Sequence, residues 1–87
     1  MLRKYKVVDE IGLHARPLSV ITNYVAQFDV PIHLVYGEKK APLHSLMMAM
    51  SLGVPTQAEF SIEIDADNAA EIFTELEGIM RKEALID

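Results

Sequence analysis

The sequence predicts an α+β fold, an open-faced sandwich in which a four-stranded, mainly antiparallel sheet carries three helices on one face. Two observations predict it. Apolar side chains recur with period two in some segments and with helical spacing in others, and these segments follow one another in the order βαββαβα. Each predicted strand also has one apolar side, which helices packed against the sheet would cover.

The strands are predicted at residues 3–9 and 31–36, in a short arm that ends at about Pro42, and at residues 58–64. The segment AEFSIEI (58–64) has the clearest pattern, because its apolar residues alternate strictly with polar ones. The letters YGEK predict a turn after the second strand. The proline at position 42 indicates an edge strand or the end of a strand, because proline cannot donate to a sheet ladder.

The helices are predicted at residues 17–28, at residues 45–53, and in a last segment whose apolar stripe runs from Ala69 to Met80. Gly53 suits the C-terminal cap of the second helix. Two sets of polar residues flank the last helix. The candidate N-terminal caps are Asp65, Asp67 and Asn68, and the basic residues that suit its C-terminal dipole are Arg81 and Lys82.

Composition narrows the class of protein. The 87 residues fit one domain spanning 1–87. The absence of cysteine excludes disulfides and thiolate metal sites, and the net charge of −5 argues against binding nucleic acid. No apolar run approaches the roughly 18–20 residues of a membrane span, and the N-terminal stretch does not resemble a signal peptide. We therefore expect a cytoplasmic protein without membrane insertion.

The stretch GLHARP, which begins at Gly12, combines residues suited to phosphate chemistry. Pro17 suits the first position of a helix, and no usual side-chain cap precedes it, so the N–H groups that follow should form an anion site. Arg16 adds a permanently charged fork for phosphate oxygens. We predict that Arg16, Pro17 and Leu18 bind phosphate and that His14, a potential nucleophile, is catalytic together with Arg16.

The other interpretation of His14 is a capping or surface histidine. The remaining histidines do not strengthen a metal interpretation, because neither His33 nor His44 has a metal-ligand spacing with His14. We therefore expect no metal and no cofactor. His33 alternates with core residues in a strand and should point toward solvent, and His44 precedes a helix without an adjacent arginine.

The motifs GLHARP (12–17) and HSLMMAMSLG (44–53), together with the C-terminal amphipathic helix, closely resemble HPr, the histidine-containing phosphocarrier family of the bacterial phosphoenolpyruvate:sugar phosphotransferase system, in its Gram-positive branch. The resemblance covers essentially the whole chain. It implies the open-faced β-sandwich of that family. It also implies that His14 accepts a phosphoryl group from phosphorylated enzyme I and passes it to the A domains of sugar permeases, with Arg16 as the anion partner.

The resemblance implies a second site at Ser45, which matches a serine that HPr kinase/phosphorylase phosphorylates with ATP; the phosphorylated form binds the catabolite control protein. A phosphate there would lie at the favourable end of a helix dipole, although a simple N-cap serine is the other interpretation. Leu46, Met47 and Met50 are predicted to dock partners, with core packing as the alternative for some of them.

We therefore expect a monomeric, stoichiometric phosphocarrier for sugar transport and carbon catabolite regulation, which is not a stand-alone enzyme. Six residues differ from those common in the family: Ile11, Leu18, Gln27, His44, Met48 and Gln57. Two alternatives stay open, the first of which rests on these differences. One is a diverged HPr-like paralogue in another phosphorelay or in a mainly regulatory role. The other is a small α+β binding module without phosphotransfer.

Overall fold

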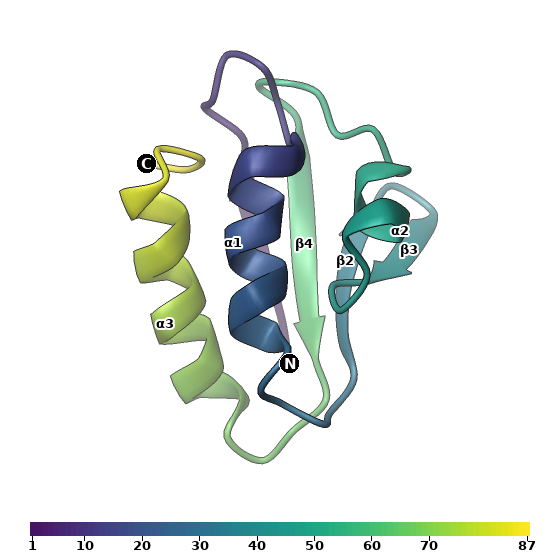
Figure 1. Ribbon diagram of the computed structural model, residues 1–87, viewed down its shortest axis with the longest axis vertical. Coiled ribbons are helices and arrows are strands. Elements are labelled where there is room, and N and C mark those ends of the chain that lie inside the picture. The colour runs from purple at the N-terminus through teal and green to yellow at the C-terminus, as the bar shows by residue number, and fades with distance from the viewer.

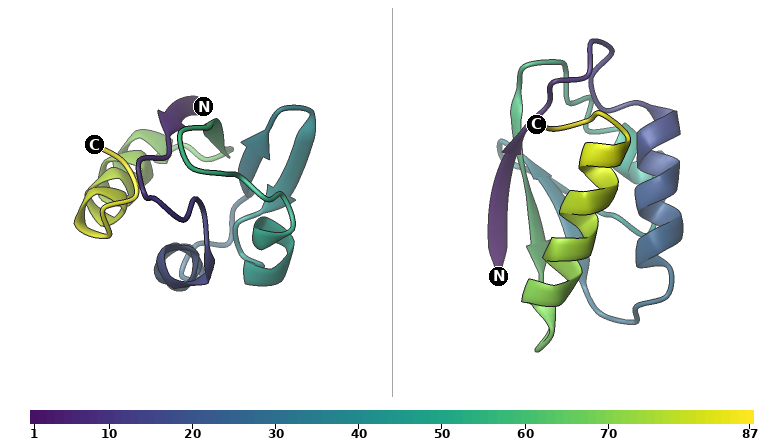
Figure 2. Two further views of the ribbon diagram at one scale, coloured as in Figure 1. Left: turned by 90° about the horizontal axis from the view of Figure 1, so that it is seen from above. Right: turned by 90° about the vertical axis from the view of Figure 1, so that its left-hand side faces the viewer.

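The computed structural model describes residues 1–87 and has the predicted βαββαβα order (Figure 1). The elements are β1 (Leu2–Lys6), α1 (Ala15–Val25), β2 (Ile32–Tyr36), β3 (Lys39–Pro42), α2 (Leu46–Met50), β4 (Glu59–Ile64) and α3 (Ala69–Lys82). The three helices lie on one face of the sheet, which leaves the other face open (Figure 2). The predicted fold class is confirmed.

The sheet has the strand order β1-β4-β2-β3, and every neighbouring pair is antiparallel. The last strand in sequence therefore lies at the centre, between the first two. In β4, Phe60 pairs with Tyr5 of β1, and Ile62 pairs with Leu34 of β2. β3 forms one edge and ends at Pro42, as that proline predicted.

The core lies between the sheet and the helices. Alternate residues of β2 and β4 point into it, because successive side chains of a strand face opposite sides. The sheet contributes Ile32, Leu34, Ala41, Phe60, Ile62 and Ile64. The helices contribute Leu18, Ile21, Val25, Ala49, Ala69, Ile72, Phe73, Leu76 and Met80. No polar or charged residue is buried, so the core is a continuous apolar layer.

The helix ends differ from the prediction in three places. α1 begins at Ala15 rather than Pro17 and ends at Val25, so that Phe28 packs against the core from the following loop. α2 is limited to Leu46–Met50, and the chain turns at Gly53, whose φ is +62°. Of the three candidate caps of α3, Asn68 occupies the N-cap position, but its side chain makes no capping hydrogen bond. The basic residues Arg81 and Lys82 do lie in its last turn.

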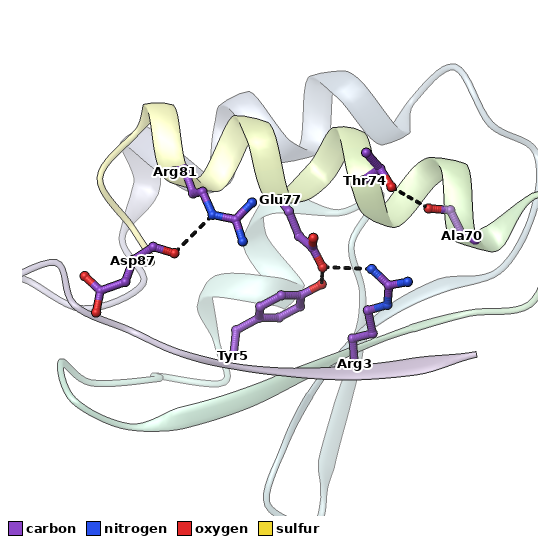
Figure 3. Close-up of polar contacts among 7 residues, drawn as sticks. All are labelled: Arg3, Tyr5, Ala70, Thr74, Glu77, Arg81 and Asp87. Carbon is purple, nitrogen blue, oxygen red and sulfur yellow. Dashed lines mark hydrogen bonds and ion pairs between the residues drawn. The ribbon is translucent and has the colours of Figure 1, made fainter.

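A polar network joins β1 to α3 (Figure 3). One carboxylate oxygen of Glu77, Oε2, accepts hydrogen bonds from the Tyr5 hydroxyl at 2.7 Å and from Arg3 Nη1 at 3.0 Å. The guanidinium of Arg3 also lies 4.9 Å from the centroid of the Phe73 ring. The hydrogen bond from Tyr5, followed by that from Arg3, holds the pKa of Glu77 below its usual value. This network fastens α3 to the sheet edge.

Candidate functional site

The loop before α1 is a tight turn built on Asp9 and Gly12. The Asp9 carbonyl oxygen accepts the Gly12 N–H at 3.1 Å, and Asp9 Oδ1 accepts the Ile11 N–H at 2.9 Å. Asp9 itself follows Val8, whose N–H donates to the carbonyl of Leu85 near the C-terminus at 2.9 Å. The aspartate is therefore fixed through its own backbone, its side chain and its neighbour.

Gly12 is where this loop meets the segment that follows α2. Its φ is +90°, and a Cβ there would lie 2.8 Å from the Val54 carbonyl oxygen and 3.0 Å from the Thr56 nitrogen. The next residue, Leu13, donates its N–H to the same Val54 oxygen at 3.0 Å. Glycine is therefore required on two counts, because a side chain would strain the backbone and would have no room.

His14 is the N-cap residue of α1, with an extended backbone (φ −119°, ψ −179°) and no side-chain capping bond. Its side chain is 27% exposed, and its Nε2 lies 3.2 Å from Asp9 Oδ2. Nδ1 makes no hydrogen bond within the chain. The pKa of Asp9 is held below its usual range, first by the Ile11 N–H and then by His14. The imidazole of His14 therefore lies at the start of α1, with Nε2 in contact with Asp9 and Nδ1 without a hydrogen-bond partner.

The first turn of α1 presents unpaired N–H groups, although not at the residues that we predicted. Because the helix begins at Ala15, the N–H groups without an acceptor are those of Ala15 and Arg16. Pro17 has no N–H, and the Leu18 N–H donates to the His14 carbonyl at 3.2 Å. Leu18 is also fully buried. The unpaired backbone N–H groups of this helix start are therefore those of Ala15 and Arg16, and not those of Pro17 and Leu18.

Arg16 adds charge to this helix start. Arg16 is exposed, and its guanidinium makes no hydrogen bond or ion pair within the chain. No acidic residue lies in the first turn of α1. Two N–H groups, the positive end of the helix dipole and a guanidinium can therefore attract an anion next to His14. No group of side chains suited to a metal ion occurs anywhere in the chain.

The second predicted site begins α2. Ser45 is its N-cap, and its hydroxyl oxygen accepts the Met48 N–H at 3.3 Å. Next to it, His44 Nε2 lies 2.9 Å from the Phe28 carbonyl oxygen. Of the predicted docking residues, Leu46 is half-buried against the core, Met47 is 82% exposed, and Met50 is also exposed. α2 packs against α1, and its start lies near the C-terminal end of α1, where His44 contacts the Phe28 carbonyl.

Sequence reasoning missed three features of this region. Asp9 was not singled out, although an aspartate three residues before a glycine is a signal for an Asx-type turn. The exposure of the Met48 and Ile11 side chains was not predicted either. Finally, the most voluminous hollow of the surface lies between His44 and residues 26–31, and His14 does not line it.

Comparisons with known proteins agree on one family. A family model described as the PTS HPr component phosphorylation site matches residues 2–82. The histidine-containing phosphocarrier protein of Mycoplasma superposes with a TM-score of 0.93 at 30% identity, over 100% of this chain and 99% of that one.

Two other solved structures are similar. An HPr dimer from Thermoanaerobacter tengcongensis gives a TM-score of 0.72 at 28% identity, over 91% of this chain and 95% of that one. HPr from Bacillus anthracis gives 0.79 at 24% identity, over 91% and 94%. No helix of the present structure combines the length and apolar character needed to cross a membrane.

Proposed function

The chain belongs to the HPr family of the phosphotransferase system, and we propose on that premise that it carries a phosphoryl group on His14. In this proposal His14 accepts the group from phosphorylated enzyme I and passes it to the A domains of sugar permeases. The protein then acts as a stoichiometric intermediate. It is phosphorylated and dephosphorylated once in each transfer and needs its partners for both steps.

The observation that carries the proposal is the free imidazole of His14 at an uncapped helix start. A ring nitrogen with a lone pair can attack phosphorus and hold the phosphoryl group as a phosphoramidate. The phosphoryl oxygens would then meet the unpaired N–H groups of Ala15 and Arg16 and the Arg16 guanidinium. These groups supply positive charge without a metal ion.

The position of His14 at the surface also favours a carrier. The side chain of His14 lies in a loop at the surface and not in the larger hollow beside His44. A group that must reach the active sites of several proteins benefits from such access. We propose that partners dock on the surface of α2 through Met47 and Met50, while Leu46 packs against the core and holds the helix in place. Methionine side chains adapt to differently shaped partners.

We also propose that Ser45 is a regulatory phosphorylation site. In this proposal HPr kinase/phosphorylase modifies it with ATP, and the modified form binds the catabolite control protein. Ser45 supports this role because it begins a helix, where a phosphate would face unpaired N–H groups. Its neighbour Met47 is the most exposed large apolar side chain of the chain. A phosphate there would change the surface that partners dock on.

Incubation with enzyme I and labelled phosphoenolpyruvate tests the proposed function. The wild-type chain should gain about one label per molecule, and the label should be labile in acid and comparatively stable in alkali, as expected for a phosphoramidate. His14→Ala should abolish labelling. The matched controls His33→Ala and His44→Ala remove the other two histidines and should label normally.

The outcomes separate the alternatives. Full labelling of His14→Ala would remove His14 from the mechanism. A wild-type chain that enzyme I does not label would favour either a binding module or a carrier in another phosphorelay. Those two would be distinguished by offering phosphorylated donors from other phosphorelays, because only a carrier would take up label on His14.

A further inference from the structure

The two carboxylate oxygens of Asp9 make different contacts, one with the loop backbone and one with His14. Oδ1 accepts the Ile11 N–H at 2.9 Å, and Oδ2 lies 3.2 Å from His14 Nε2. The first contact closes a local turn of the loop, so the carboxylate cannot rotate without losing it. The orientation of Oδ2 toward the imidazole is therefore fixed by the backbone and not by the histidine.

This geometry decides which imidazole nitrogen carries the proton. An ionised carboxylate only accepts hydrogen bonds, and the pKa of Asp9 lies below its usual range, so the group is ionised at neutral pH. The contact between Oδ2 and Nε2 is a hydrogen bond only if Nε2 carries the hydrogen. In the neutral ring the lone pair then belongs to Nδ1, which has no partner within the chain.

We propose that Asp9 is a positioning residue for phosphoryl transfer, which holds His14 in the tautomer protonated on Nε2. The inference rests on the proposed function, because it concerns the nitrogen that attacks. A carboxylate that hydrogen-bonds a catalytic imidazole has the same task in hydrolase triads, where it fixes the tautomer and stabilises the charged ring without itself being protonated.

The transfer step balances with this arrangement. The Nδ1 lone pair forms the bond to phosphorus, and the bond from phosphorus to the leaving atom of the phosphorylated donor protein breaks. The leaving atom keeps the electron pair of that bond. The proton stays on Nε2, so the ring gains positive charge as the new bond forms, and the Asp9 carboxylate faces that charge at 3.2 Å.

The opposite tautomer is disfavoured by the same contact. With the proton on Nδ1, the lone pair of Nε2 would face a carboxylate oxygen at hydrogen-bond distance, and two acceptors would repel each other. A phosphoryl group on Nε2 would also have to displace Asp9 and would bring negative charge against it. Asp9 therefore occupies Nε2 and leaves Nδ1 without a partner within the chain.

Asp9→Asn is the decisive variant because the loop dictates how the amide must lie. The Ile11 N–H requires an oxygen at the Oδ1 position, so the NH₂ group faces Nε2 of His14. An N–H donor there favours a lone pair on Nε2 and moves the proton to Nδ1. The substitution thus reverses the tautomer while it keeps the size of the side chain and the local turn.

The matched control is Glu10→Gln. It makes the same chemical change and the same change of charge at the adjacent residue, whose exposed carboxylate has no hydrogen bond within the chain. Imidazole ¹⁵N chemical shifts report the tautomer in unphosphorylated protein, at a pH where the same spectra show a neutral ring. Transfer rates from enzyme I report the consequence. The Ile11 amide shift and the melting temperature show that the loop is intact.

We expect Nε2–H in the wild type and in Glu10→Gln, and predominantly Nδ1–H in Asp9→Asn. Transfer to Asp9→Asn should be at least about tenfold slower, because one charge-assisted hydrogen bond shifts a tautomer ratio by about that factor or more.

A wild-type ring protonated on Nδ1 would overturn the inference. So would an Asp9→Asn variant with the tautomer or the transfer rate of Glu10→Gln. If the wild type takes no phosphoryl group, the proposed function fails, and the ¹⁵N shifts still decide whether Asp9 sets the tautomer.

Discussion

The two proposed phosphorylation residues occupy the same position in two helices, yet their side chains are used differently. His14 and Ser45 are the N-cap residues of α1 and α2 and have similar extended backbones. Ser45 accepts the Met48 N–H and so caps its own helix. His14 makes no capping bond, and its ring turns to Asp9 in the preceding loop.

The difference shows how one backbone position can serve stability or chemistry. In α2, which has only five residues, the cap satisfies an N–H that would otherwise be unpaired. In α1, an eleven-residue helix packed on the core through Leu18, Ile21 and Val25, the start can stay uncapped. The longer helix retains free N–H groups at its start, where an anion can use them. Substitutions at and around the two helix starts test this comparison.

Gly12→Ala should disrupt the contact between the loop before α1 and the segment that follows α2. The new Cβ would strain a residue with φ +90° and would meet backbone atoms of Val54 and Thr56, which cannot move as freely as a side chain. We expect a loss of about 3 kcal/mol in the free energy of unfolding, combining backbone strain with overpacking. Urea denaturation measures it.

Gly37→Ala is the control for that variant. Gly37 also has a positive φ, +60°, but a Cβ there would have no neighbour within 4 Å. It should cost only the strain of the left-handed backbone, about 1–2 kcal/mol. Equal losses for both glycines would mean that the contact with the segment after α2 does not constrain the His14 loop.

Arg16→Ala should slow phosphoryl transfer while leaving the fold intact. Its guanidinium has no partner within the chain, so its removal should change the free energy of unfolding by less than about 0.5 kcal/mol. A stabilising charge at a reacting group is often worth about 2–4 kcal/mol, and solvent exposure lowers this, so we expect transfer roughly tenfold slower.

Stopped-flow transfer from enzyme I, with thermal melting alongside, would measure the effect of Arg16. Arg81→Ala removes the same charge near the end of α3 and should transfer at the wild-type rate. Arg16→Lys keeps the charge without the planar fork and should lie between the two. An Arg16→Ala chain as fast as the Arg81→Ala control would reduce Arg16 to a surface charge.

Substitutions at Ser45 should separate capping from docking. Ser45→Ala removes the capping oxygen and should cost about 1 kcal/mol of stability, with transfer unchanged. Ser45→Asp retains an acceptor for the helix start but places negative charge beside Met47, so transfer should slow several-fold through weaker docking. Melting curves and the dependence of the transfer rate on enzyme I concentration measure the two effects. Wild-type transfer by Ser45→Asp at wild-type stability would refute the docking explanation.

Tyr5→Phe should affect neither helix start, since the network of Arg3, Tyr5 and Glu77 holds α3. The hydrogen bonds lower the pKa of Glu77 from its usual 4.5. Their stabilisation is therefore fully present above pH 4.5 and disappears as the pH falls through the lowered value. We expect the variant to be less stable than wild type by about 1 kcal/mol or less at neutral pH, with a smaller difference in acid.

Chemical denaturation at several pH values would test the Tyr5 network. Tyr36→Phe is the matched control, because its hydroxyl makes no hydrogen bond within the chain. It should show no comparable dependence on pH, and neither variant should transfer phosphoryl groups more slowly. A difference between Tyr5→Phe and wild type that grows in acid would contradict the role assigned to Glu77.

Local patterns were sufficient to predict the elements. The alternation of Phe60, Ile62 and Ile64 with polar residues identifies β4. Successive side chains of a strand point to opposite faces, so a strand with one buried face shows this alternation. The start of α1 was misplaced because Pro17 is equally acceptable at the third helical position, where no helix partner exists for its missing N–H. Strand order depends on pairings such as Tyr5 with Phe60, which no local pattern encodes.

The site was predicted less completely than the fold. His14 and Arg16 lie two positions apart in the sequence, and their residue types alone suggest phosphate chemistry. The role of Asp9 depends on a turn that is held by Gly12 against Val54, and contacts across such a separation leave no periodic signal. The left-handed backbone of Gln57, whose φ is +68°, was not predicted, because the sequence marked this residue only as one that differs from the family's common residue.

We expect the phosphoryl group to reside on His14, at the uncapped start of α1. ¹⁵N and ³¹P NMR of histidine-labelled protein, phosphorylated with enzyme I and phosphoenolpyruvate, tests it directly, because the chain has only three histidines. We predict that one imidazole shows ¹⁵N–³¹P coupling, that it is the ring of His14, and that the signals of His33 and His44 keep their uncoupled form. Coupling at His33 or His44, or a phosphorus signal typical of a serine ester with no coupled ring, would contradict the account.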